Sequence, residues 1–102
     1  MIMTERISCE EIISIYNIEI TFINALEDSG LIHPEIEDEI KYILHDELTN
    51  LERFVNWHYE MEVNMPGIEV IHRLITQIET LQQENRRLLK QTEISLNEFI
   101  DM

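Results

Sequence analysis

Histidine, cysteine and carboxylate side chains are the residues of this sequence that could hold a metal ion or act as a nucleophile. His58 and Glu62 are four positions apart, a spacing that puts two metal ligands on one face of a helix. Two ligands without a third indicate a metal site only weakly. Cys9 has no histidine near it in the sequence, and Gly30 and Gly67 are too few for a glycine-rich phosphate loop. We therefore expect a protein that is not an enzyme and needs no metal or cofactor.

An excess of carboxylates is the strongest chemical feature. The 102 residues include seven basic and 21 acidic side chains, which gives a net charge of −14. Residues 1–64 hold three basic and fifteen acidic side chains, so their net charge is −12. Such a surface repels phosphate backbones and attracts basic partners, although scattered carboxylates more often only keep a protein soluble.

Six carboxylates form a dense cluster within thirteen residues that contain no Lys or Arg. Like charges at this spacing repel each other, so we do not expect the cluster to stabilise the fold. It is either a solvated loop or a site for a basic partner. The candidate partner-binding residues are Glu27, Asp28, Glu35, Glu37, Asp38 and Glu39.

Two short helices joined by a tight turn are predicted to carry the first part of this cluster. Ser8 and Glu11 form a capping box, and the helix that follows stops near Asn17. A second helix starts around Glu19 and ends with Gly30 as its carboxyl-terminal cap. This order predicts a helix-turn-helix motif.

A β-hairpin and a third helix are predicted to complete a body of residues 1–63. Residues 31–34 and 40–43 are rich in strand formers and flank a charged loop, residues 35–39, as in a small wing. The third helix spans about residues 46–62. Trp57 falls outside its inner face and is either half-buried, the commoner case, or part of a partner surface. The side chains expected on that face are Leu48, Leu51, Phe54, Val55, His58 and Tyr59.

The rest of the chain, residues 64–102, is predicted to form one long helix. No proline or glycine interrupts it after Gly67, and Pro66 suits its first turn. Apolar residues recur along this helix at intervals of three and four positions, which places them on one face. We expect this face to form a two-chain coiled coil, with Asn85 at an a-type position that sets its register. Folding back onto its own body is the alternative. The candidate dimer interface is Ile71, Leu74, Ile78, Leu81, Asn85 and Leu88.

The chain resembles the MerR-type winged-helix regulators in the order of these elements and in residues 30–34, GLIHP, which fit the exit from the second helix into the wing. The fold implied is mainly α: a MerR-like winged helix-turn-helix body with a small β-hairpin wing and a long C-terminal helix. In those regulators an R-x-x-R-Y-Y stretch grips DNA. Residues 21–26 here read TFINAL, so both arginines and both tyrosines are absent, which argues against DNA binding.

The sequence is also similar to the CbpM family of chaperone modulators. The similarity lies in residues 65–68, MPGI, in residues 81–89, LQQENRRLL, and in residues 34–36, PEI, followed by Tyr42. CbpM proteins bind the J-domain of CbpA, a DnaJ-like co-chaperone, and restrain its activity. The resemblance therefore implies a chaperone modulator that binds a J-domain and inhibits the co-chaperone; a MerR-type DNA-binding transcriptional regulator is the alternative.

The expected location is the cytoplasm. A single cysteine fits a reducing compartment, and the first residues show no apolar signal segment. No apolar run is long enough to span a bilayer, so no membrane association is expected.

Overall fold

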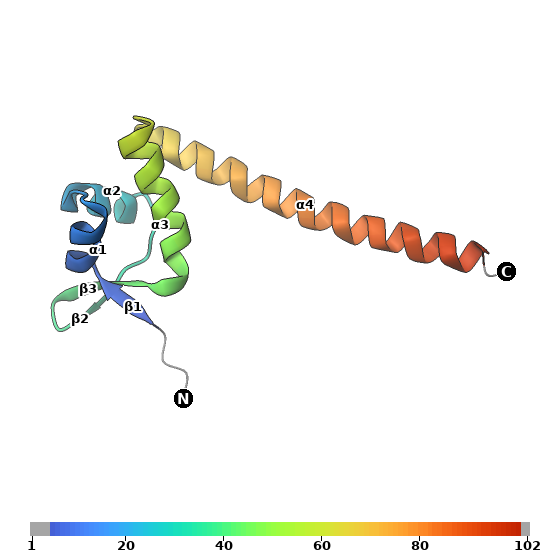
Figure 1. The fold of residues 1–102 in the computed structure, drawn as a ribbon, viewed down its shortest axis with the longest axis horizontal. Coiled ribbons are helices and arrows are strands. Elements are labelled where there is room, and N and C mark those ends of the chain that lie inside the picture. Colours follow the sequence, from blue (N-terminus) through green and yellow to red (C-terminus); the bar gives the residue numbers. More distant parts are fainter. Residues whose placement is uncertain (1–4, 101–102) are drawn as a thin grey trace. The chain divides into compact units, whose positions relative to one another are not determined.

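The structure is a computed structural model that describes residues 5–100, with side chains described as far as residue 94. Figure 1 shows the chain, which divides into two compact units, Met1–Glu69 and Val70–Met102. The elements of the first unit, in chain order, are β1 (Arg6–Ser8), α1 (Cys9–Tyr16), α2 (Ile20–Asp28), β2 (Glu35–Glu37), β3 (Ile40–Leu44), η1 (His45–Glu47), α3 (Leu48–Val55) and η2 (Asn56–Glu60). The helix α4 (Met65–Ile100) begins in the first unit and forms the second. The predicted division into a winged helix-turn-helix body, residues 1–63, and a long dimerisation helix, residues 64–102, stays a prediction.

The helix-turn-helix is built as its local sequence predicts. The Ser8 hydroxyl accepts a hydrogen bond from the backbone N–H of Glu11 at 3.2 Å and so caps α1. Asn17 ends α1 with a left-handed φ of 54°, and Gly30 follows α2 with a φ of 74°. Asparagine and glycine tolerate this conformation, which explains why both helices stop where they do.

The wing differs from the prediction in the position of its first strand. Residues 31–34 form no strand; β2 comprises Glu35–Glu37, so the segment predicted as a charged loop is half strand. The turn is only Asp38 and Glu39, whose positive φ values of 52° and 66° match the type I′ turn that fits the twist of a two-residue hairpin. Residues 31–34 are rich in strand-forming side chains, but Pro34 lacks the backbone N–H that a β-sheet hydrogen bond needs.

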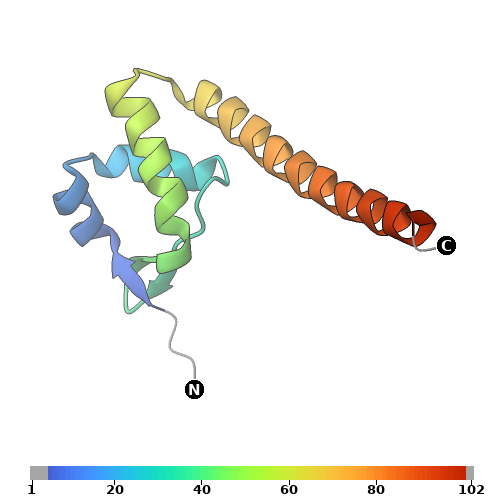
Figure 2. The ribbon, with the colours of Figure 1, turned by 45° about the vertical axis from the view of Figure 1, so that its right-hand side comes forward.

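A third strand, β1, was not predicted. It pairs antiparallel with β3, with Ile7 opposite Ile43, so the sheet has the strand order β1-β3-β2. Figure 2 shows the three strands gathered at one end of the first unit. A lone hairpin is marginal in water, and the extra strand gives β3 a hydrogen-bonded partner on each side.

The third helix is irregular and shorter than predicted. It starts as the 3-10 turn η1, continues as α3, and finishes as the π-helical turn η2, which ends at Glu60. Glu62 lies beyond it with a φ of 58°. The prediction that His58 and Glu62 share a helix face is therefore wrong, because the chain has already turned at Glu62. The His58 Nδ1–H instead donates to the Val63 carbonyl at 3.0 Å.

One apolar core joins the sheet to the helices of the first unit. Of the predicted inner face, Leu51 and Phe54 are fully buried, whereas Tyr59 is 39% exposed. Trp57 packs against the core while only half-buried, as predicted. Burial raises the pKa of the Cys9 thiol, so this cysteine is a protonated core residue rather than a nucleophile. The buried set is Cys9, Ile12, Ile18, Phe22, Ile23, Leu26, Ile32, Ile43, Leu51, Phe54 and Ile68.

The long helix α4 begins at the predicted cap. The Asn64 side-chain oxygen accepts a hydrogen bond from the backbone N–H of Gly67 at 2.9 Å. A Cβ at Gly67 would lie 2.7 Å from Val63 Cγ1, so the close approach of the chain here requires glycine. At 1.5 Å per residue, α4 is roughly 54 Å long. Among the described residues, no helix has both the length and the apolarity needed to cross a membrane. The mainly α fold with a small β wing and a long C-terminal helix is confirmed.

Candidate partner-binding surface

The outer surface of α2 is where a helix-turn-helix protein would meet DNA. Its exposed side chains are Ile20, Thr21, Asn24 and Asp28. No Lys or Arg lies on this helix, although phosphate contacts by cations supply most of the non-specific affinity of a protein for DNA. The absence of the gripping stretch from the sequence therefore leaves an uncharged to acidic face in the structure.

Arg6 is engaged by the wing. Its guanidinium donates a hydrogen bond to the Glu37 carboxylate, lies 3.6 Å from Glu35, and stands 4.1 Å above the centre of the Tyr42 ring. The hydrogen bond to Glu37 raises the pKa of Arg6. The strand register explains this grouping, because Glu35 is opposite Tyr42 and Arg6 is opposite Leu44 on the same outer face of the sheet.

Lys41 is engaged on the other face of the wing. Its amine donates to a Glu27 carboxylate oxygen at 2.6 Å and lies 3.4 Å from the Asn24 side-chain oxygen, so it ties β3 to α2. The hydrogen bond to Glu27 raises the pKa of Lys41. Arg53, the remaining basic residue of the first unit's described part, also has an interaction partner. Arg6 and Lys41 are therefore both paired with carboxylates of the same unit.

The six candidate carboxylates do not form one uniform patch. Glu27 pairs with Lys41, 14 positions away in the sequence, and Glu35 and Glu37 pair with Arg6, 29 and 31 positions away. The expectation that the cluster contributes nothing to the fold is wrong for these three. Each pair is partly exposed, so its contribution is small. Asp28, Asp38 and Glu39 lie outside these pairs and carry the charge that a partner would meet.

The tip of the wing combines that charge with apolar surface. Asp38 and Glu39 form its turn, and the flanking Ile36 and Ile40 are 66% and 44% exposed. We call these four residues the wing tip. The two carboxylates are among the residues predicted from the sequence, whereas the two isoleucines, which alternate with charged residues along β2 and β3, are not. Exposed apolar side chains between carboxylates suit an amphipathic, basic partner surface.

The candidate dimer residues lie along one stripe of α4. Leu74, Ile78, Leu81 and Leu88 are between 46% and 62% exposed, Ile71 is half-buried and Asn85 is exposed. A metal site has no support in residues 5–94, where the structure places no group of three or more His, Cys, Asp or Glu side chains to hold an ion.

A comparison with known protein families gives a match that agrees with this architecture. The model of the family described as MerR HTH family regulatory protein matches residues 7–90, which include the helix-turn-helix, the wing and most of α4. No curated protein and no solved structure matched the chain. The match covers well over half of the sequence, and the order of its elements agrees with it. The chain therefore belongs to the MerR HTH regulatory protein family.

Proposed function

We propose that this protein is a chaperone modulator that binds the J-domain of a DnaJ- or CbpA-like co-chaperone and inhibits it. The observation that carries the proposal is the state of the DNA-facing surface: α2 holds no cation, and Arg6 and Lys41 are held by carboxylates of the same unit. A protein with this surface keeps the family's fold, but its excess of negative charge favours binding to a basic protein over binding to DNA. The similarity to CbpM described above supplies the identity of that partner.

The proposal describes a binding protein rather than an enzyme, and it places the protein in the cytoplasm with its partner. We propose in addition that α4 forms a homodimer through the stripe of Ile71, Leu74, Ile78, Leu81, Asn85 and Leu88. Apolar side chains at 46–62% exposure along one face would be covered by the same face of a second copy.

The second candidate is a DNA-binding regulator, which the family match favours. The two functions predict opposite results in a pair of titrations. We expect a purified J-domain to bind in a calorimetric titration. We expect duplex DNA to give no gel shift at micromolar protein, because residues 1–64, with a net charge of −12, can release few counterions. A salt-dependent gel shift without J-domain binding would establish the regulator instead.

A variant of the wing tip tests where the partner docks. Replacing Asp38→Asn together with Glu39→Gly removes two charges and installs the dipeptide that type I′ turns prefer, while Glu37 keeps its pair with Arg6. We expect association with the J-domain to slow severalfold at low salt, and the difference to shrink at high salt, because rim charges act mainly on association rate and are screened beyond ~8–10 Å. Stopped-flow fluorescence measures the association rates of the wild type and the variant at low and at high salt.

The same variant carries its own folding control. Asn and Gly adopt the left-handed conformations of this turn at lower cost than Asp and Glu, so the free energy of unfolding should rise by about 1 kcal/mol rather than fall. The matched charge control is Glu10→Gln with Glu11→Gln, which removes two exposed carboxylates from α1. Equal slowing by both variants would indicate general charge attraction, and an unchanged rate at low salt would remove the wing tip from the site.

A further inference from the structure

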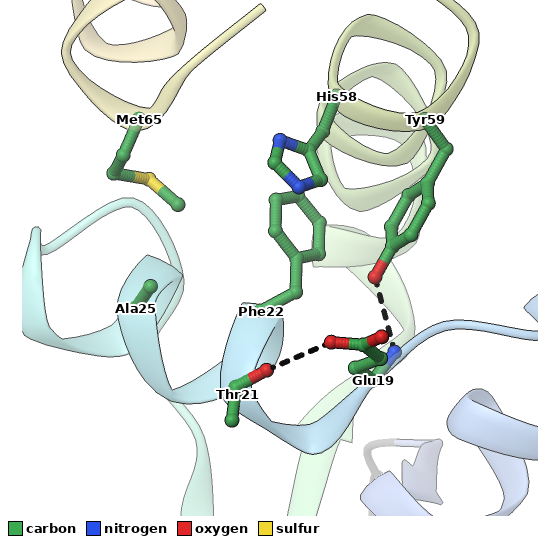
Figure 3. Close-up of a pocket in the computed structure, with 7 residues that line it drawn as sticks. All are labelled: Glu19, Thr21, Phe22, Ala25, His58, Tyr59 and Met65. Atoms are coloured by element: carbon green, nitrogen blue, oxygen red, sulfur yellow. Dashed lines mark hydrogen bonds between the residues drawn. The ribbon is translucent and has the colours of Figure 1, made fainter. Parts of the chain in front are cut away.

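A pocket of about 340 Å³ lies between α2 and η2, and none of the residues proposed to bind the J-domain or to form the dimer lines it. Figure 3 shows the side chains that line it within the first unit. The Phe22 ring stacks on His58 with their centres 4.5 Å apart, and the Phe22 and Tyr59 rings meet edge to face with their centres 5.3 Å apart. Met65 and Ala25 complete the apolar part of the wall. The pocket is therefore lined largely by aromatic rings and small or flexible apolar groups.

One carboxylate stands at this aromatic wall. Glu19 is the N-cap of α2, and its backbone N–H donates to the Tyr59 hydroxyl at 3.1 Å, which fixes the start of the helix against η2. Its carboxylate accepts a hydrogen bond from the Thr21 hydroxyl at 3.2 Å, a neutral donor. Glu19 lines the pocket, and its carboxylate lies between Thr21 and the Tyr59 hydroxyl, close to the Phe22 side chain (Figure 3). An aromatic wall with a carboxylate is the combination that binds organic cations.

We propose that this pocket binds the guanidinium of an arginine side chain from the basic partner protein. The planar guanidinium stacks on aromatic rings and binds a carboxylate with two parallel hydrogen bonds, whereas a lysine amine does neither. The net charge of −12 in residues 1–64 attracts such a side chain, and Thr21 and Glu19 give it acceptors. The inference rests on the proposed function only in that the arginine belongs to a protein partner.

The direct test uses the full chain and a small probe, so it does not require the partner. N-acetyl-arginine amide is titrated into the isotope-labelled protein and followed by two-dimensional NMR. We expect amide shifts at Thr21, Ala25 and His58 with the arginine probe. The neutral isostere N-acetyl-citrulline amide should give none there, and N-acetyl-lysine amide should bind more weakly, because only the guanidinium can both stack and pair.

Two variants address the pocket by different routes. Glu19→Gln removes the charge but keeps the shape, and we expect about three- to fivefold weaker binding of the arginine probe, the size of one partly exposed ion pair. Ala25→Leu fills the pocket without changing charge and should abolish the localised shifts. Glu60→Gln is the control, since it removes an equal charge from η2 at a residue that does not line the pocket.

The outcomes separate this inference from the proposed function. Shifts that are equal for the arginine and citrulline probes, or unaffected by both Glu19→Gln and Ala25→Leu, would overturn the arginine pocket even if the J-domain binds. A localised arginine response in a protein that does not bind a J-domain would leave the pocket in place and refute the chaperone role. If both hold, Glu19→Gln should also weaken J-domain binding, while Glu60→Gln should not.

Discussion

Leu81→Asp is expected to dissociate the proposed homodimer into monomers. Leu81 lies at the centre of the stripe on α4 and is 62% exposed in the single chain. In a symmetric dimer the change occurs twice in one seam, where each leucine contributes about 1.5–3 kcal/mol on burial. The aspartate would in addition bury a charge without a partner. A loss of about 4 kcal/mol or more raises the dissociation constant by at least roughly a thousandfold.

Sedimentation velocity at several protein concentrations measures this change. The matched control is Ile94→Asp, which makes the same kind of substitution on α4 at a residue that is 58% exposed. Ile94 follows Leu81 by thirteen positions, so at 3.6 residues per turn it lies about 140° away around the helix. We expect the control to remain a dimer. A wild-type protein that sediments as a monomer would refute the interface, and dissociation of both variants would move it to another face.

Local chemistry allowed the helix boundaries to be predicted. Ser8 and Asn64 each bond a backbone N–H three positions further on, and Asn17 and Gly30 adopt left-handed conformations by themselves. These signals need no distant partner, so a sequence read in order contains them. The third helix was predicted to run to Glu62, but the chain adopts a left-handed φ there. Glutamate is rare in this conformation, unlike asparagine or glycine, so the sequence does not indicate a helix end at this position.

The features that could not be predicted from the sequence depend on contacts between residues far apart in the chain. The strand β1 forms because Ile7 finds Ile43 across the sheet, and this register depends on partners 36 positions apart. The same register puts Arg6 beside Glu37, so a cluster that looks purely repulsive in one dimension is partly neutralised in three. The pocket is a similar case: Phe22 and His58 are 36 positions apart, and only the packing of α2 against η2 stacks their rings.

The core of the first unit should depend most strongly on Phe54. This side chain is fully buried in α3 and lies under Trp57, with ring centres 5.8 Å apart. Truncation of a buried phenylalanine costs about 3–5 kcal/mol, because it removes apolar contacts and leaves a cavity. Domains of about 70 residues have a stability of roughly 3–10 kcal/mol at 0.05–0.15 kcal/mol per residue. Phe54→Ala is therefore expected to leave the unit barely folded.

Urea unfolding monitored by tryptophan fluorescence tests this directly, because Trp57 is the only tryptophan of the chain and packs on the substituted ring. Circular dichroism provides a second signal that is independent of the indole environment. Thr49→Ala, an exposed position on α3, is the matched control and should change the free energy of unfolding by less than about 0.5 kcal/mol. A cost below about 1 kcal/mol for Phe54→Ala would mean that the core collapses around the cavity. In that case the sheet and the helices would not depend on Phe54 for their common packing, and the position of the wing relative to α2 would have to rest on the pair of Lys41 with Glu27.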